Sequence, residues 1–538
     1  MAYRFAIVIA FLVGAYALLA FHLYQLQIVK GDYYYARAAS EADAAASASG
    51  SRGSISFTDL NGNLLPAAVE QPFPYIYAVP TAIEDPQEAA NTIAPILNLP
   101  NMPASTLINI FSRKGDSYEL LERKADASVA QAVTDANIKG VYADTEPDRF
   151  YPLGTVASQV LGYVGPNANS TGESGFYGIE QYYDSELSAG QDIQLTIDPN
   201  IQIEAEKILD DLVAANGATG GSIIVEDPKT GKILAMGATP SFDPNNYSSS
   251  SIANFLNPTI ESVYEPGSIF KVLTMAAGID AGKITPQTTY DDKGYVDVNK
   301  AHITNYDLTT HGPYGPGTTM TQVIEHSINT GAIYAENQIG NAIFTDYMKK
   351  FRIDQLTGID LPGEVEGNLS ELNPKNRQVD FDTVAYGQGV SVTPIGLISA
   401  IEAIANGGVM MKPYLNAADA PQSLGRIIST STATQVTQMM VDAVDLAGVT
   451  NISGYSLAGK TGSAFIPDLV HGGYTNNLID SYVGFGPASN PQFIGLIRLN
   501  TLPSTSLAAE SVVPAFKELS QWIINYYNIP PDRPTAGQ

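Results

Sequence analysis

The chain of 538 residues contains no cysteine. This absence excludes thiol catalysis, cysteine-ligated zinc and iron–sulfur sites, a disulfide framework and a lipid-modified N-terminal cysteine. Basic residues are also few. The chain has 28 Lys and Arg and 55 Asp and Glu, which gives a net charge of -27. Phosphate contacts need clustered Lys and Arg, so we expect no nucleic-acid partner. The five histidines show no metal-site spacing, and we expect no metal and no other cofactor.

One run of residues that is both uncharged and strongly apolar lies at the N-terminus. Residues 5–21 carry no charge, and the apolar character continues to about Leu26. This length is enough for one membrane-spanning helix. A cleaved signal peptide is the alternative, but its apolar core is normally shorter and ends at a small-residue cleavage site. We therefore predict that residues 1–28 form a short N-terminal segment and an uncleaved transmembrane helix.

The segment that follows has the pattern of a mixed α+β module. Asn61-Gly62 between short apolar runs predicts a hairpin, and apolar residues alternate as in a strand over 73–79. Helical spacing occurs over 84–99 and 125–138. No catalytic constellation emerges between residues 55 and 190.

The remainder of the chain predicts one sheet built from both of its ends. Asp198 is placed to cap a helix that continues to Ala215. Further strands are predicted over 222–226, 232–236, 455–465, 480–485 and 492–499, and helices over much of 320–350 and 395–447 and over 514–527. Helices between a first hairpin and three last strands favour a sheet covered by helices.

Ser268 and Lys271 are the first candidates for chemistry. A helical pattern begins at Ser268, directly after Pro266-Gly267, and the spacing of three puts both side chains on one helix face. A neighbouring amine can accept the proton of a hydroxyl, and a helix start favours developing negative charge. This pattern indicates a serine acyltransferase. A capping serine followed by a surface lysine is the alternative.

Two further short motifs follow in order. The first is Ser327 with Asn329, and the second is Lys460-Thr461-Gly462 inside an apolar strand. A glycine within a strand indicates close approach of a ligand or of backbone, as expected if an extended substrate pairs with that strand. Another copy, Lys229-Thr230-Gly231, falls in a tight turn, where Thr-Gly is ordinary turn chemistry. We interpret that copy as structural.

With these three motifs in order, the chain resembles a class B penicillin-binding protein, which is a membrane-anchored peptidoglycan D,D-transpeptidase. The resemblance covers nearly the whole sequence. It also includes Arg52-Gly53, Asp59, Asn61-Gly62, Arg149-Phe150-Tyr151-Pro152, Gly162-Tyr163-Val164-Gly165, Gly178-Ile179-Glu180, Leu195-Thr196-Ile197-Asp198, Asp243-Pro244-Asn245, Tyr264-Glu265-Pro266-Gly267, Thr357-Gly358-Ile359-Asp360, Gly387-Gln388-Gly389 and Ala405-Asn406-Gly407-Gly408.

The resemblance implies a role for each catalytic residue. Ser268 would attack the carbonyl between the last two D-alanines of a stem pentapeptide, and Lys271, desolvated and with a lowered pKa, would take its proton. Ser327 would pass a proton toward the leaving amine. Asn329 would orient Lys271 and the substrate amide, and Lys460 would attract the substrate carboxylate.

The resemblance also implies the substrate-binding residues. The hydroxyls of Thr461 and Ser463, on either side of Gly462, would bind that carboxylate. The backbone N–H groups of Ser268 and Ser463 would form the oxyanion hole. A β-lactam would mimic the substrate and leave Ser268 stably acylated.

The chain departs from the family's habit at a few positions. Ile269 and Ser463 stand where threonine is usual, although serine keeps the hydroxyl. Residues 184–195 lack a longer insertion that many relatives carry. The stretch 500–503 lacks an acidic residue often seen before its proline. None of these departures removes a catalytic group.

The resemblance implies an α+β fold with four parts. The anchor at 1–28 would be followed by a mixed α+β pedestal, the penicillin-binding protein dimerisation domain, over 29–198. A transpeptidase domain over 199–533 would contain an antiparallel sheet covered by helices on both faces, and a tail would occupy 534–538. Because the substrate lies outside the cytoplasmic membrane, we expect a single-pass protein with its N-terminus inside and its catalytic domain extracytoplasmic.

The expected partners are peptidoglycan stem peptides, β-lactams, the membrane, cell-division or elongation complex proteins, and a membrane-embedded glycan polymerase of the shape, elongation, division and sporulation type. The short pedestal and the missing insertion favour a septal role, with side-wall elongation as the alternative. A β-lactam sensor normally has more membrane spans. The intact catalytic set argues against a structural divisome protein, and a secreted β-lactamase would need a water-activating glutamate that we cannot assign.

Overall fold

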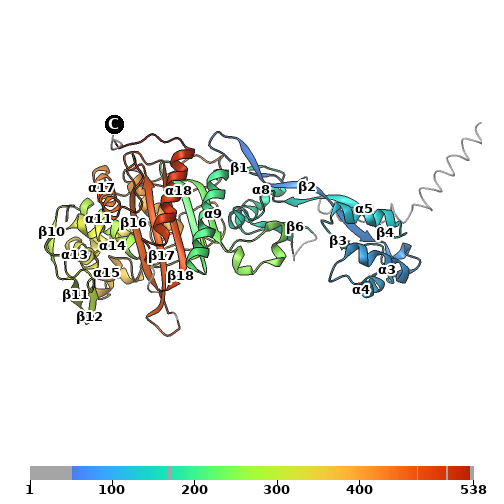
Figure 1. The fold of residues 1–538 in the computed structure, drawn as a ribbon, viewed down its shortest axis with the longest axis horizontal. Helices are drawn as coiled ribbons and strands as arrows, with labels where there is room; N and C mark the ends of the chain where they lie inside the picture. Colours follow the sequence, from blue (N-terminus) through green and yellow to red (C-terminus); the bar gives the residue numbers. More distant parts are fainter. Residues whose placement is uncertain (1–50, 168–171, 469, 504–506, 534–538) are drawn as a thin grey trace, which may run out of the picture.

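The computed structural model describes residues 51–167, 172–468, 470–503 and 507–533. The predicted anchor over 1–28, the start of the predicted pedestal and the tail over 534–538 lie outside these residues. Within the described ranges, no helix is both long enough and apolar enough to cross a membrane. The described chain forms an elongated N-terminal module attached to a larger C-terminal domain (Figure 1).

The N-terminal module is organised around one long strand, β2 (Leu64–Ala78). Its first residues pair with β1 (Ile55–Thr58), and its remainder pairs antiparallel with β4 (Val141–Phe150). β3 (Glu119–Glu122) also pairs with the end of β2, and β7 (Ile193–Leu195) pairs parallel with β1. The helices α3 (Pro86–Leu97), α4 (Ala104–Phe111) and α5 (Ala127–Ala136) lie around the far end of this strand (Figure 1).

The predicted hairpin at Asn61-Gly62 is confirmed, because β1 and β2 are antiparallel neighbours. The Asp59 carboxylate accepts hydrogen bonds from the backbone N–H groups of Asn61 at 2.8 Å and Asn63 at 2.7 Å. Gly62 has a φ of 79°, a conformation that glycine adopts without steric cost. The two predicted helices also form, with slightly shorter bounds.

A buried ion cluster ties the end of β4 to α7 (Gly178–Tyr182) and to the residues before β1. Arg149 at the end of β4 donates through Nε to Glu180 Oε1 at 2.7 Å, and Arg52 donates through Nε to Glu180 Oε2 at 2.9 Å. Glu180 belongs to α7 and is fully buried. Arg149 also donates to the carbonyl of Gly53 at 2.8 Å. The charges are therefore paired and additionally hydrogen-bonded, as buried charges must be.

The C-terminal domain contains a five-stranded antiparallel sheet in the order β16–β17–β18–β8–β9. Two strands come from the start of the domain and three from its end, as predicted. The bounds are β8 (Gly220–Asp227), β9 (Lys232–Thr239), β16 (Ala458–Pro467), β17 (Tyr474–Gly486) and β18 (Phe493–Pro503). β17 begins six residues before the predicted start, because its polar first residues extend the hairpin with β16 beyond the apolar core.

Helices cover both faces of this sheet, as the resemblance implied. On one face, α9 (Pro199–Asn216) and α18 (Val512–Tyr526) share an apolar core with the strands (Figure 1). The Asp198 carboxylate caps α9 by accepting from the N–H groups of Asn200 and Ile201. On the other face, the core includes α11 (Phe270–Asp280), α16 (Pro394–Ala405) and α17 (Thr430–Ala447).

Smaller helices complete the second layer. They are α12 (Met320–Glu325), α13 (Asn329–Ile339), α14 (Asn341–Lys350) and α15 (Gln378–Val384). The loop between α12 and α13 carries Ser327, so this layer brings a candidate residue toward α11 and β16.

Replacing Glu180 by Ala is expected to leave Arg52 and Arg149 buried without their shared carboxylate. Removing one partner of a buried ion pair costs about 3–5 kcal/mol, so the free energy of unfolding should fall by that amount. Denaturant titration followed by circular dichroism measures the change. Glu84 provides the control, because it is 83% exposed in its pair with Lys139 and Glu84→Ala should cost under about 1 kcal/mol. Equal effects of the two substitutions would contradict a structural role for the cluster.

Candidate active site

Ser268 lies at the junction of a 3₁₀ turn over Gly267–Ile269 and the start of α11. Gly267 has a φ of 55°, and a Cβ built on it would lie 2.7 Å from the carbonyl oxygen of Ser463. Only glycine therefore lets this turn approach β16 so closely. Ile269, where threonine was expected, is fully buried in the apolar core. The sequence predicted that a helix begins at Ser268. In the structure the first turn is a 3₁₀ turn, which is tighter than an α-helix, and α11 begins at Phe270.

The Gly387-Gln388-Gly389 segment supports the same turn from the other side. The N–H of Gly267 donates to the carbonyl of Gly387 at 3.1 Å. A Cβ on Gly387 would lie 2.0 Å from the carbonyl oxygen of Gly267, and its φ of 88° also requires glycine. This segment therefore packs against the backbone that carries Ser268.

The Lys271 amine occupies the centre of the site. Its Nζ lies 3.0 Å from Ser268 Oγ, and it donates to the carbonyl oxygen of Ser327 at 2.5 Å. The side chain is fully buried. Burial, and secondly the charge of Lys460, hold the pKa of Lys271 well below its ordinary value. A neutral amine at this distance can accept the proton of Ser268.

Ser327 connects the two lysines. Its Oγ lies 3.2 Å from Lys271 Nζ and accepts a hydrogen bond from Lys460 Nζ at 3.0 Å. Ser327 has a φ of 57°, an uncommon left-handed conformation for a residue other than glycine. Such conformations persist only where the surrounding structure requires them, and they cluster at active sites. The chain of contacts Ser268–Lys271–Ser327–Lys460 could carry a proton.

Lys460 extends from β16 toward this hydroxyl. The side chain is 4% exposed, and burial lowers its pKa to about 7. It also lies 3.2 Å from Thr461 Oγ1. A Cβ on Gly462 would lie 2.5 Å from the carbonyl oxygen of Pro266. Of the two interpretations of this strand glycine, close approach by the protein's own backbone is therefore the observed one.

Ser463 is the next residue on β16 and takes part in a contact that the motif did not predict. Its Oγ donates to Asp480 Oδ1 at 2.6 Å. The expected bond would instead run to a substrate carboxylate. An acidic residue within the apolar run of β17 was the sequence signal that could have revealed Asp480.

Asn329 lies beside the cluster but contacts another element. It is the first residue of α13, and its Nδ2 donates to the carbonyl of Thr304 at 2.9 Å. Across the described residues, no hydrogen bond joins Asn329 to Lys271. The structure thus brings Ser268, Lys271, Ser327 and Lys460 into direct contact, whereas the expected contact of Asn329 with Lys271 is not made.

Glu265 is a further residue at this site. Its Oε1 accepts from the N–H of Gly389 at 3.0 Å, and Tyr474 donates through its hydroxyl to Oε2 at 3.1 Å. Burial raises the pKa of Glu265. Glu265 directly precedes the turn that holds Ser268. Its carboxylate joins the Gly387-Gln388-Gly389 segment to the β16–β17 hairpin. The sequence motif contained Glu265 but gave no indication of this bridging role.

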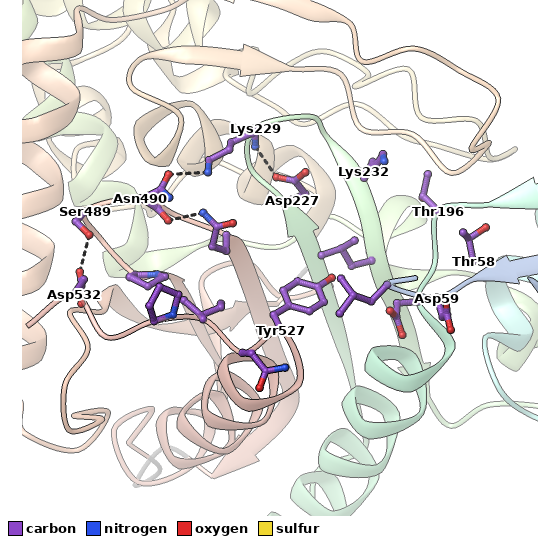
Figure 2. A pocket seen from close by; sticks show the side chains of 18 of the residues that line it. Thr58, Asp59, Thr196, Asp227, Lys229, Lys232, Ser489, Asn490, Tyr527 and Asp532 are labelled. Carbon is purple, nitrogen blue, oxygen red and sulfur yellow. Dashed lines mark hydrogen bonds between the residues drawn. The ribbon is translucent and has the colours of Figure 1, made fainter. Parts of the chain in front are cut away.

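A large cavity of about 650 Å³ lies elsewhere, between the β1–β2 turn, the β8–β9 turn and the end of α18 (Figure 2). None of the predicted catalytic residues lines it. Lys229 of the second Lys-Thr-Gly copy lies there and donates to Asn490 Oδ1 at 2.7 Å. Thr230 donates to Asp227 Oδ2 at 2.6 Å, which is the predicted turn chemistry. Contact geometry, rather than cavity size, therefore identifies the candidate site.

Several known proteins are similar to this chain along most of its sequence. The chain is 27% identical over 570 residues to the peptidoglycan D,D-transpeptidase FtsI of Escherichia coli, covering 99% of this chain and 94% of the relative. It is 29% identical to stage V sporulation protein D of Bacillus subtilis, covering 83% and 74% of the two chains. It is 27% identical to penicillin-binding protein PbpB of Mycolicibacterium smegmatis, covering 84% and 76%.

Solved structures show the same fold. Penicillin binding protein 3 of Mycobacterium tuberculosis, complexed with aztreonam, superposes with a TM-score of 0.68 at 22% identity, covering 90% of this chain and 98% of that one. A peptidoglycan synthetase of Bifidobacterium adolescentis gives a TM-score of 0.67 at 24% identity, covering 90% and 97%.

Two families match consecutive parts of the chain. The penicillin-binding protein dimerisation domain matches residues 47–205. The penicillin binding protein transpeptidase domain matches residues 221–521, which is more than half of the chain. The motifs of the sequence, the helix-covered sheet and these matches agree, and the chain belongs to the class B penicillin-binding protein transpeptidases.

Proposed function

We propose that this protein is a serine-type peptidoglycan D,D-transpeptidase that also binds β-lactams covalently. The observation that carries the proposal is the Lys271 amine, which is buried, has a lowered pKa and lies 3.0 Å from Ser268 Oγ. A nucleophile within reach of a neutral base is the requirement for covalent acyl transfer. The relatives named as D,D-transpeptidases support the same reaction.

In the first half-reaction, Ser268 Oγ bonds to the carbonyl carbon between the last two D-alanines of a stem pentapeptide. Its proton moves to Lys271. The C–N bond then breaks, and the leaving D-alanine amine receives a proton through Ser327, which lies between the two lysines. Lys460 and Thr461 bind the carboxylate of the departing residue. Asn329 is proposed to bind the substrate amide through its side-chain oxygen Oδ1, because its hydrogen bond to the Thr304 carbonyl uses the side-chain nitrogen Nδ2.

The carbonyl oxygen becomes negative during attack, and the N–H groups of Ser268 and Ser463 are proposed to stabilise it. The turn at Gly267 supports this arrangement, because a Cβ there would lie 3.3 Å from the backbone nitrogen of Ser463. One donor of this kind contributes about 3–4 kcal/mol in comparable sites. Gly462 and Gly267 allow the two segments to approach.

In the second half-reaction, an amine of a neighbouring stem peptide attacks the acyl-enzyme. The attacking amine gives up a proton to Lys271, and the ester bond to Ser268 Oγ breaks as the new amide bond, the cross-link, forms. Lys271 then returns that proton to Ser268 Oγ. A β-lactam forms the same acyl-enzyme. The leaving nitrogen of the β-lactam remains tethered to the acyl group. It therefore occupies the position that the acceptor amine would need to attack the acyl-enzyme.

The proposed organisation follows the sequence: an anchor over 1–28, a pedestal over 29–198, a transpeptidase domain over 199–533 and a tail over 534–538. The catalytic domain would be extracytoplasmic, since stem peptides are outside the membrane. The domain supplies acyl transfer alone, so a membrane-embedded glycan polymerase would extend the glycan. The short pedestal favours a septal role, and a fluorescent fusion that localised to the side wall instead of midcell would support elongation.

Replacing Ser268 by Ala is expected to abolish covalent labelling by a fluorescent penicillin, because the acylated oxygen is lost. Labelling is measured by gel fluorescence after denaturation. Ser248→Ala, an exposed serine outside the site, should label like the wild type. Release of D-alanine from a donor peptide, with a new amide to an added D-amino acid, separates a transpeptidase from a sensor. Rapid drug turnover would instead indicate a β-lactamase, and a wild type without label would refute the proposal.

The rate of acylation by carboxylate-bearing β-lactams is expected to fall as pH rises through about 7. Burial lowers the pKa of Lys460 to about 7. Below that pH the amine is charged and attracts the carboxylate, and above that pH the charge is lost. Stopped-flow fluorescence across the neutral range measures the rate constant. Lys460→Arg should remove this decline, because guanidinium stays charged. A wild-type rate that does not decline above pH 7 would contradict the assignment to Lys460.

A further inference from the structure

Ser463 and Asp480 form a pair across two strands beside the candidate site. The two residues are direct partners in the antiparallel register of β16 and β17. Ser463 Oγ donates to Asp480 Oδ1 at 2.6 Å, which is the short distance of a bond between a hydroxyl and a carboxylate. Ser463 lies two residues after Thr461, so both side chains project from the same face of the strand.

Asp480 is held in place by more than this one bond. The side chain is fully buried. Its second oxygen, Oδ2, accepts a hydrogen bond from the hydroxyl of Ser511 at 2.9 Å, directly before α18. Two serine hydroxyls from different elements therefore direct their donors at one carboxylate. Asp480 has little freedom to turn away from Ser463.

This geometry limits what Ser463 can offer to a ligand. A hydroxyl has one proton and two lone pairs, and an ionised carboxylate can only accept. The Ser463 proton is therefore directed at Asp480, and the hydroxyl can offer only lone pairs to a ligand. A substrate carboxylate needs donors, so it gains nothing from Ser463 in this arrangement, and Asp480 adds a negative charge behind the hydroxyl.

We propose that Asp480 is a specificity-determining positioning residue that withholds the Ser463 hydroxyl from the carboxylate of the acyl donor. The inference rests on the proposed transpeptidase function. Lys460 and Thr461 then hold the carboxylate without the third donor that the family motif implies. The site accordingly reacts less efficiently with carboxylate-bearing acyl donors than the Lys-Thr-Gly-Ser sequence alone would indicate.

A purely structural role for Asp480 would be to fasten β17 to the start of α18 through Ser511. The two roles differ in what they predict about ligands. Loss of a structural tether would affect all acyl donors alike. Release of the Ser463 hydroxyl would affect only donors that carry a carboxylate.

The test uses Asp480→Asn, which keeps the shape of the side chain. Its amide nitrogen can donate to Ser463 Oγ, so the Ser463 proton becomes available to the cleft. The second-order rate constant of acylation is measured for benzylpenicillin and for its uncharged methyl ester. We expect about a tenfold increase for benzylpenicillin, which is the effect of one added hydrogen bond to a charged group, and a change under about twofold for the ester.

Two further variants separate the roles. Ser511→Ala breaks the bond between Asp480 and the start of α18 but leaves the Ser463 pair, so the ratio of the two rate constants should stay at the wild-type value. In a Ser463→Ala background, Asp480→Asn should no longer change that ratio. If Asp480→Asn does not fold, as judged by thermal melting, the same ratio is measured for Asp480→Ala.

The outcomes distinguish this inference from the function on which it rests. If the wild-type protein is acylated by neither compound, the proposed function fails. If the wild type is acylated and Asp480→Asn leaves the ratio unchanged or lowers it, Asp480 does not withhold the hydroxyl and the inference fails. A selective gain for benzylpenicillin that depends on Ser463 supports it.

Discussion

The burial of the Lys271 amine is the constraint on which the site depends. An amine without water carries its charge only at high cost, so the pKa falls and a base becomes available beside Ser268. The amine is not left without partners, because Ser268 and Ser327 surround it at hydrogen-bond distance. A second buried amine, that of Lys460, approaches the same hydroxyl of Ser327. The charge of Lys460 is a second cause, after burial, of the lowered pKa of Lys271.

Three elements must meet for this burial to occur, and glycines permit the contact. α11 supplies Lys271, the loop before α13 supplies Ser327, and β16 supplies Lys460. The turn before α11 touches β16 through Gly267 and Gly462, where any larger side chain would collide with backbone. A base of this kind therefore requires backbone segments packed at distances that only glycine allows. The N-terminal module depends on a different interaction, a buried ion cluster in which Glu180 pairs with Arg149 and Arg52.

Much of the fold follows from local rules that act within short segments. The Asn61-Gly62 hairpin, the cap at Asp198 and the strand periodicity of the final three strands depend on nearby residues, so the sequence predicted them. The turn at Gly267 and the early start of β17 were less predictable. The first depends on contact with β16, and the second on hairpin pairing beyond the apolar core. Neither contact leaves a periodic pattern in the sequence.

The sequence by itself determined the family, the order of the motifs and the candidate residues Ser268, Lys271, Ser327 and Lys460, because each motif is a local arrangement of a few side chains. Only the tertiary structure decided which of them touch, since hydrogen bonds between residues more than fifty positions apart depend on packing. It placed the amide of Asn329 on Thr304 and the hydroxyl of Ser463 on Asp480. A hydroxyl donates a single proton, and its direction is set by the strongest acceptor nearby, which the motif does not contain.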